Sequence, residues 1–164
     1  MTAPPSREDA RALIVLRVAP EWVDYNGHLN DAEYGRVFSL AADALLEAIG
    51  LDGDGRRRHH YTFYTTEAHV CYRRAAYEGQ WLSVGATLLD RGAKRLQVFF
   101  AMRNAENALL ATSEQLLMGI NSDSGRPAPF PPSVDAAINT LPTLAADAWP
   151  ALAGRRIGLR SRRY

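Results

Sequence analysis

The chain has 164 residues, 47% of them hydrophobic and 23% charged, with a formal net charge of +1. This length predicts a single domain that can bury a core, and the near-neutral charge provides no overall field for binding nucleic acid. A single cysteine excludes an internal disulfide and fits a reducing compartment, and the sequence has neither a signal pattern nor a membrane-length apolar run, so we expect a cytoplasmic protein without a membrane partner.

The first half of the chain predicts one strand, one polar loop and one helix. Residues 1–10 contain prolines and scattered polar side chains, which is typical of a disordered terminus. The run 12–18, ALIVLRV, is short, apolar and rich in β-branched residues, as in a strand. After a polar loop, residues 31–49 carry apolar side chains at steps of three and four up to Gly50, which predicts a helix buried on most sides.

The second half predicts a meander of antiparallel strands. A polar connection, LDGDGRRR at 51–58, leads into it. Four strand-like stretches follow, separated by short turn-forming segments: 61–77, 81–90, 94–104 and 108–121. Because short connections join antiparallel neighbours, these strands are expected to form one sheet. The predicted fold class is α+β, with the sheet curled around the helix.

The C-terminal part predicts little regular structure. The segment 122–133 holds four prolines, which cannot take part in regular strand pairing. Ser133 is expected to cap a short helix at 134–141, and the rest forms a mobile arm or packs on a partner subunit. The predicted organisation is a disordered terminus at 1–10, one domain at 11–132, and a short helix with a basic arm at 133–164.

The loop at 22–30, WVDYNGHLN, contains the polar side chains best suited to acid–base or hydrogen-bond chemistry. Four of them stand at every second position, which in an extended chain aims side chains to one side: Asp24, Asn26, His28 and Asn30. Because Gly27 interrupts this run, we expect an extended loop that ends in a helix cap.

The start of the helix fixes one end of this loop. Asn30 is a good N-cap residue, and Glu33 has the spacing to reach back to the N–H of Asn30 in a capping box. A helix N-terminus presents unpaired N–H groups and partial positive charge, which would stabilise a developing oxyanion.

Asp24 is the first candidate for a general base. Its aromatic neighbours Trp22 and Tyr25 would desolvate the carboxylate and make it a better base. The alternative is a turn aspartate that binds nearby backbone. In the same way, His28 either donates a hydrogen bond to a reacting carbonyl or packs, and Asn26 either orients water or belongs to an ordinary turn.

A second candidate carboxylate, Glu67, lies in the middle of a predicted strand. A charge that faced the core there would need a functional reason, whereas one that faced solvent would only pair with an arginine across the sheet. Glu114 has the same ambiguity, because the sequence does not fix which face of the sheet meets the helix.

Other kinds of site are disfavoured. The chain has no nucleophile elbow, glycine-rich phosphate loop or paired cysteines, and its histidines lack metal-ligand spacing, so no metal is expected. Cys71 lies in an apolar run and is predicted to be a buried, inert thiol. Arginines cluster at 56–58 and at 155–163, and solvated surface is the preferred interpretation over a phosphate site.

Residues 10–132 resemble the hotdog-fold acyl-CoA thioesterases. The resemblance rests on DYNGHLN at 24–30, on Tyr34 in a long apolar helix, and on the four-strand meander. The D-x-N-x-H-x-N pattern is similar to that of plant acyl-carrier-protein thioesterases. The chain is identified as a member of the 4-hydroxybenzoyl-CoA thioesterase-like branch, and four segments are similar to the thioesterase domain associated with L-carnitine dehydrogenases: PEWVDYNGHLNDAEY, EAHVCYRRAAYEGQ, KRLQVFFAMRN and LLATSEQLLMGI.

This resemblance implies hydrolysis of a short acyl-CoA thioester, with betainyl-CoA as the implied substrate. It also implies a homodimer or homotetramer with the active site at the subunit interface, and no bound cofactor, because coenzyme A is part of the substrate. Asp24 takes the position of the family's catalytic acid, and Asn26 and His28 match the motif. Because hotdog enzymes differ in which carboxylate acts, Glu67 remains a competitor.

The implied substrate suggests further contacts. Five aromatic side chains could form a cage for a quaternary ammonium, with core or interface packing as the alternative: Trp22, Tyr25, Tyr34, Tyr61 and Tyr64. Asn30 is expected beside the substrate. Four basic side chains could meet the phosphates of coenzyme A: Lys94, Arg95, Arg73 and Arg74. An acyl-CoA dehydratase or hydratase and a non-catalytic acyl-CoA-binding module remain alternative functions.

Overall fold

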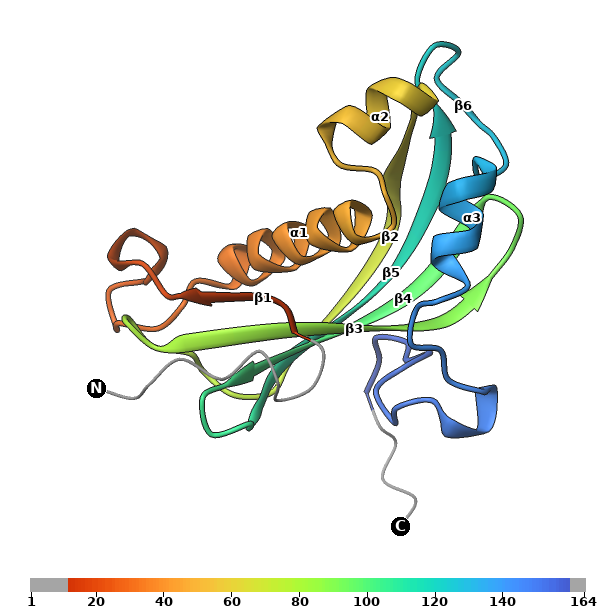
Figure 1. The fold of residues 1–164 in the computed structure, drawn as a ribbon. Helices are drawn as coiled ribbons and strands as arrows, with labels where there is room; N and C mark the ends of the chain where they lie inside the picture. The colour runs from red at the N-terminus through yellow and green to blue at the C-terminus, as the bar shows by residue number, and fades with distance from the viewer. Residues whose placement is uncertain (1–11, 160–164) are drawn as a thin grey trace.

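The computed structural model describes residues 12–159 and is shown in Figure 1. Its elements follow in chain order: β1 (Ala12–Arg17), the short 3-10 helix η1 (Pro20–Trp22), α1 (Asp31–Ala48), α2 (Gly53–His59), β2 (Tyr61–Tyr72), β3 (Trp81–Arg91), β4 (Arg95–Asn104), β5 (Leu109–Asn121), β6 (Arg126–Pro127), α3 (Pro132–Ile138) and η2 (Ala146–Ala148). The disorder predicted for 1–10 and the last arginines of the basic arm fall outside the described residues.

One antiparallel sheet organises the chain. Its strand order is β1–β3–β4–β5–β2, and β6 pairs with the end of β5. The α+β class and the meander of β3, β4 and β5 are confirmed. The expected pairing of the first two meander strands is wrong, because β2 ends at Tyr72 and lies at the opposite edge of the sheet from β1. Residues 73–80 carry the chain across to β3, whose free side is taken by β1.

Helix α1 covers one face of the sheet, which we call the inner face (Figure 1). Its periodic apolar residues, among them Val37, Phe38 and Leu45, are buried as predicted, and the ring of Phe38 lies 6.5 Å from that of Phe100 on β4. The opposite side of the helix remains exposed, including Leu40 at 42%. The helix is therefore buried along one side and not on most sides.

The polar connection predicted at 51–58 is largely helical. Asp52 caps α2, since its Oδ1 accepts a hydrogen bond from the N–H of Gly55 at 2.7 Å. Three arginines and a histidine fill the last turn, where positive charge suits the helix dipole. This segment has no hydrophobic periodicity, so only its capping chemistry could have indicated the helix.

The C-terminal segment packs on its own sheet as far as residue 159. Helix α3 begins at Pro132, with Pro131 as its N-cap, so the predicted cap at Ser133 is wrong. Residues 142–144 then extend the edge of β3, where Leu88 donates to Pro142 O at 2.8 Å and accepts from Leu144 N at 3.1 Å. Within residues 12–159 no helix is both long and apolar enough to span a membrane.

Candidate active site

A groove of about 500 Å³ opens where the N-terminus of α1 meets the end of β2. We call it the α1 groove. Its lining combines the predicted loop with the segment that follows β2: Asp24, His28, Leu29, Asn30, Asp31, Tyr34, Tyr72, Arg73, Arg74 and Ala75. Three of the four alternating polar residues of the loop are thus brought together, and the fourth, Asn26, is not among the lining residues.

The polar loop is a tight hairpin. Asp24 N donates to His28 O at 2.8 Å, and Gly27 N donates to Asp24 O at 2.9 Å. Gly27 adopts a φ of 75°, a left-handed conformation that suits glycine. The turn replaces the alternation of an extended chain, so Asp24 and His28 meet at its base while Asn26 is exposed at its tip.

The Asp24 carboxylate is half-buried and partly engaged by its own turn. Its Oδ1 accepts hydrogen bonds from the N–H groups of Asn26, at 2.8 Å, and His28, at 3.1 Å. This is the backbone-binding role that the sequence left open. It fixes the orientation of the carboxylate and leaves Oδ2, which the turn does not use, for chemistry in the groove.

The start of α1 is capped, but not by a capping box. Asn30 Oδ1 accepts from Ala32 N at 3.0 Å, as predicted, whereas Asn30 N donates to Trp22 O at 2.9 Å and is not free for Glu33. The N–H of Glu33 donates to Asn30 O at 3.0 Å. Among residues 12–159 the N–H of Asp31 has no such partner, so it is able to donate to a ligand in the α1 groove.

Two tyrosines form one wall of the α1 groove. The hydroxyl of Tyr34 donates to Arg74 O at 3.3 Å and accepts from Ala76 N at 3.0 Å, which holds the segment after β2 against α1. The ring of Tyr72 packs edge-on against that of Tyr34 at 5.2 Å, and its hydroxyl donates to Asp31 O at 3.3 Å.

Both of these tyrosines stay protonated at neutral pH. Burial raises the pKa of Tyr34 above its ordinary value, and burial together with the nearby Asp31 carboxylate raises that of Tyr72. Tyr34 therefore stays neutral, and its hydrogen bonds to the segment after β2 shape the groove. His28 stands on the opposite side of the loop base, with its ring edge-on to Tyr77 at 5.1 Å.

Glu67 lies away from this groove. It faces the outer side of the sheet, opposite α1, where it lines a separate pocket of about 310 Å³ with His69 and Glu114. Glu114 accepts from Gly154 N at 2.6 Å, so this pocket is closed by the C-terminal segment. Within one chain Asp24 and Glu67 line different pockets.

The predicted aromatic cage is not assembled within one chain. Tyr25 is 97% exposed at the tip of the hairpin, and the ring of Trp22 already carries the Arg36 guanidinium 5.5 Å from its centre. Tyr61 is buried at the far end of β2, and Tyr64 is 56% exposed on the outer side of β2. Of the five predicted aromatics, the α1 groove contains only Tyr34.

The remaining predictions have mixed outcomes. Arg73 and Arg74 line the groove. Arg95 does not, because it lies on β4 opposite Met118 of β5, at the other end of the sheet. Sequence reasoning missed Tyr72 and Asp31. Tyr72 reaches the groove from a distant strand, which leaves no local signal, whereas Asp31 directly follows the predicted loop at the start of α1. Cys71 is only partly buried, 3.7 Å from the His69 ring. In residues 12–159 no three His, Cys, Asp or Glu side chains are placed to hold a metal ion.

Comparison with known proteins places this geometry in a family. The model of the thioesterase-like superfamily matches residues 18–138. The chain is 41% identical to the betainyl-CoA thioesterase of Pseudomonas aeruginosa, over 87% of this chain and 91% of that protein. It is also 37% identical to the L-carnitine dehydrogenase/betainyl-CoA thioesterase of Agrobacterium fabrum, over 73% of this chain but only 25% of that longer protein.

The fold leads to the same family. A Staphylococcus aureus protein solved in complex with CoA superimposes with a TM-score of 0.82 at 29% identity, over 90% of this chain and 94% of that one. The curled antiparallel sheet over a long helix is the hotdog arrangement that the resemblance implied. The chain belongs to the thioesterase-like superfamily.

Proposed function

We propose that this protein hydrolyses betainyl-CoA to betaine and coenzyme A. One observation carries the proposal: the α1 groove holds an oriented carboxylate, Asp24, beside a helix-start N–H, in a chain 41% identical to a betainyl-CoA thioesterase. Coenzyme A enters as part of the substrate, and no further cofactor is proposed.

The groove supplies the parts that thioester hydrolysis needs. Asp24 Oδ2 removes a proton from water as the water oxygen bonds to the thioester carbon, or attacks that carbon directly. The N–H of Asp31 and the His28 ring stabilise the negative charge that develops on the carbonyl oxygen. The carbon–sulfur bond then breaks, and the coenzyme A thiolate leaves and takes up the proton that Asp24 removed from water. In the direct-attack route the thiolate takes its proton from solvent, and water then hydrolyses the acyl–Asp24 anhydride, which releases betaine and restores the carboxylate.

The charges of the groove suit betainyl-CoA, whose betainyl group is positively charged and whose coenzyme A part is negatively charged. Asp24 and Asp31 make one side of it negative, and Tyr72, which is 52% exposed, offers an aromatic ring to the trimethylammonium group. Arg73 and Arg74 line the same groove and are exposed, so they can meet phosphate oxygens.

We also propose that the functional unit is a homodimer in the cytoplasm. β2 is 12 residues long, has β5 as its one neighbour among the strands of residues 12–159, and is exposed from Tyr64 to Ala68. Such an edge presents a row of unpaired N–H and C=O groups that a second copy of the strand can pair. The single cysteine supports a reducing compartment.

A panel of acyl-CoA thioesters tests the activity. Purified protein is assayed for free thiol with betainyl-CoA, acetyl-CoA and butyryl-CoA, and we expect kcat/KM to be highest for betainyl-CoA. A much higher kcat/KM for acetyl-CoA or butyryl-CoA would contradict betainyl-CoA as the substrate. Hydration of an enoyl-CoA without release of thiol would instead favour the dehydratase alternative.

A further inference from the structure

We propose that the basic helix α2 of one subunit completes the α1 groove of its partner and binds the phosphates of coenzyme A there. This inference rests on the proposed thioesterase function and on the proposed dimer. It assigns a ligand to the two exposed arginines of this helix, Arg57 and Arg58.

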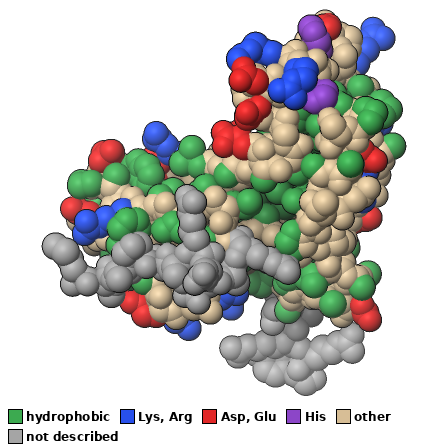
Figure 2. Space-filling model, viewed as in Figure 1, with side chains coloured by type: hydrophobic (Ala, Val, Ile, Leu, Met, Phe, Trp, Pro, Cys, Tyr) green, Lys and Arg blue, Asp and Glu red, His purple; other side chains and the backbone are tan. Residues whose placement is uncertain are grey.

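Helix α2 carries a cluster of basic side chains. Figure 2 shows blue and purple side chains at the top of the molecule, where α2 lies, with red acidic side chains beside them. Arg57 and Arg58 are exposed, and Arg57 pairs with Asp54 of the same helix. Arg56 differs, because its Nε donates to Leu51 O at 2.7 Å and helps to hold the helix in place.

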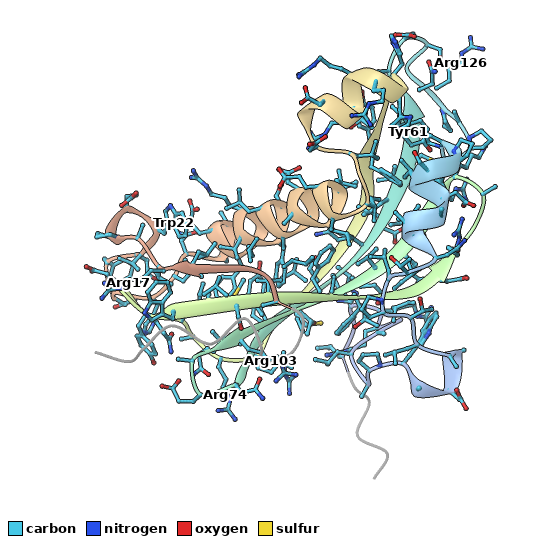
Figure 3. All side chains as sticks on the ribbon, viewed as in Figure 1. Arg17, Trp22, Tyr61, Arg74, Arg103 and Arg126 are labelled. Carbon is cyan, nitrogen blue, oxygen red and sulfur yellow. The ribbon has the colours of Figure 1, made fainter. Side chains whose placement is uncertain are left out.

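Within one chain this surface cannot reach the α1 groove. Helix α2 ends at His59, immediately before β2, whereas the groove lies at the other end of β2 (Figure 3, Tyr61 and Arg74). At about 3.3 Å per residue, a strand of this length separates the two ends by roughly 36 Å. A second, antiparallel copy of β2 reverses this relation and brings the two ends together.

A bulge in β2 restricts the register of such a pair. The ladder with β5 shifts between Thr65 and Glu67, so the residues that face the inner side are odd-numbered before the bulge and even-numbered after it. Opposite residues of two paired strands must share a face. Two registers keep both inner faces aligned and lie within half a residue of the middle of the exposed run. We take the one that sets Thr65 opposite the partner's Ala68, and Tyr61 opposite the partner's Tyr72.

This register brings charges from two subunits to one groove. The partner's α2 directly precedes its own Tyr61, so it lies beside Tyr72 and the exposed Arg73 and Arg74. Helix α2 also follows α1 closely, since a Cβ on Gly55 would lie 1.9 Å from Gly50 O, which keeps it at the inner face where the groove opens. Four arginines then surround a site whose proposed substrate carries several phosphate charges.

The first experiment separates binding from folding. In the Arg57→Gln/Arg58→Gln variant we expect KM for betainyl-CoA to rise roughly tenfold, with kcat within about twofold of wild type. The Arg57→Lys/Arg58→Lys variant should recover most of the loss, because the charge is kept. Arg156→Gln, an exposed arginine at the outer face, is the matched control and should keep the wild-type KM. An unchanged KM in the glutamine variant would overturn the inference.

The second experiment tests whether the contact crosses subunits. Differently tagged Asp24→Asn and Arg57→Gln/Arg58→Gln chains are co-expressed, and the mixed dimer is purified. If α2 serves the partner's groove, one site of the mixed dimer is entirely wild type, so the wild-type KM returns with half the wild-type kcat.

The failures of the two proposals are distinguishable. If α2 served its own chain, no site of the mixed dimer would be intact and KM would stay high, which would overturn this inference alone. If the wild-type protein releases no thiol from betainyl-CoA, the proposed function itself is wrong. Absence of a mixed dimer on size exclusion would overturn both the dimer and this inference.

Discussion

In the proposed mechanism Asp24 combines two tasks in one side chain. One carboxylate oxygen holds the hairpin through the N–H groups of Asn26 and His28, and the other is left for chemistry. The sequence presented these as competing interpretations, but the geometry makes them compatible. A base whose position is fixed by its own turn needs less reorganisation when the substrate binds.

The residues that could be predicted for the site are those whose placement is local. Asp24, His28 and Asn30 come from one hairpin next to a helix cap, and the chain alone indicated both. Tyr72 could not be found in this way, because it reaches the groove from a strand that pairs with β5 and not with its neighbour in the chain. Tyr25 failed as a predicted ligand because the turn points it to solvent.

Tyr61 leads to a prediction about the stability of the protein at alkaline pH. The side chain is 2% exposed, its hydroxyl donates to Ala128 O at 2.7 Å, and burial raises its pKa to about 12. In the unfolded chain the phenol ionises near its ordinary value of 10. Stability is therefore retained below pH 10 and lost as pH rises towards 12, by at most about 1.4 kcal/mol per pH unit from this group.

The measurement is the free energy of unfolding by denaturant from pH 9 to 12. In Tyr61→Phe we expect lower stability at neutral pH, from the lost hydrogen bond, and a shallower decline above pH 10. Tyr64→Phe, at an exposed tyrosine, serves as the control. An undiminished decline in Tyr61→Phe would show that Tyr61 is not its source.

At the level of elements, the sequence predicted those with a strong period. Helix α1 and strands β3, β4 and β5 were placed within one or two residues, because their burial patterns are regular. Helix α2 was missed, since GDGRRRH has no apolar stripe. The expected β2–β3 hairpin was wrong because β1, more than 60 residues earlier than its partner on β3, takes that position in the sheet.

The docking of α2 depends on one glycine. A Cβ on Gly55 would lie 1.9 Å from Gly50 O, so Gly55→Ala must push the helix away from the end of α1. We expect this change to lower the free energy of unfolding by about 1–3 kcal/mol, as overpacking does. Gly53→Ala is the matched control, because the nearest atom to its Cβ is a flexible Arg57 nitrogen at 3.6 Å.

Denaturant unfolding of both variants at one protein concentration tests this. Equal stability of Gly55→Ala and Gly53→Ala would show that α2 is not held by the close contact. A lower stability confined to Gly55→Ala would confirm that the contact positions the helix.

At the scale of the whole molecule, the proposed dimer forms through the open edge of β2. Ala68→Glu should weaken the dimer, because it places two further carboxylates near the symmetric centre of the proposed strand pair. Ala148→Glu, an exposed alanine in η2, is the control. Sedimentation or size exclusion over a range of concentrations should show dissociation of the first variant only, and an unchanged dimer would place the interface elsewhere.

The mode of subunit pairing was the feature hardest to predict from the sequence. The sequence located the strands but not which of them forms an edge, and edge position depends on the full pairing order. In the proposed dimer, the Asp24 end of one subunit lies beside the basic helix of the other. The proposed catalytic and phosphate-binding residues then belong to different copies of the same chain.

The central claim is that Asp24 performs the hydrolysis of betainyl-CoA. Its most direct test is release of thiol from saturating betainyl-CoA by Asp24→Asn, with Asp43→Asn, an exposed aspartate on α1, as the control and circular dichroism to confirm the fold. We predict that Asp24→Asn loses at least about a hundredfold in kcat while Asp43→Asn retains wild-type turnover. A folded Asp24→Asn protein with full activity would contradict the account and move the role to Glu67.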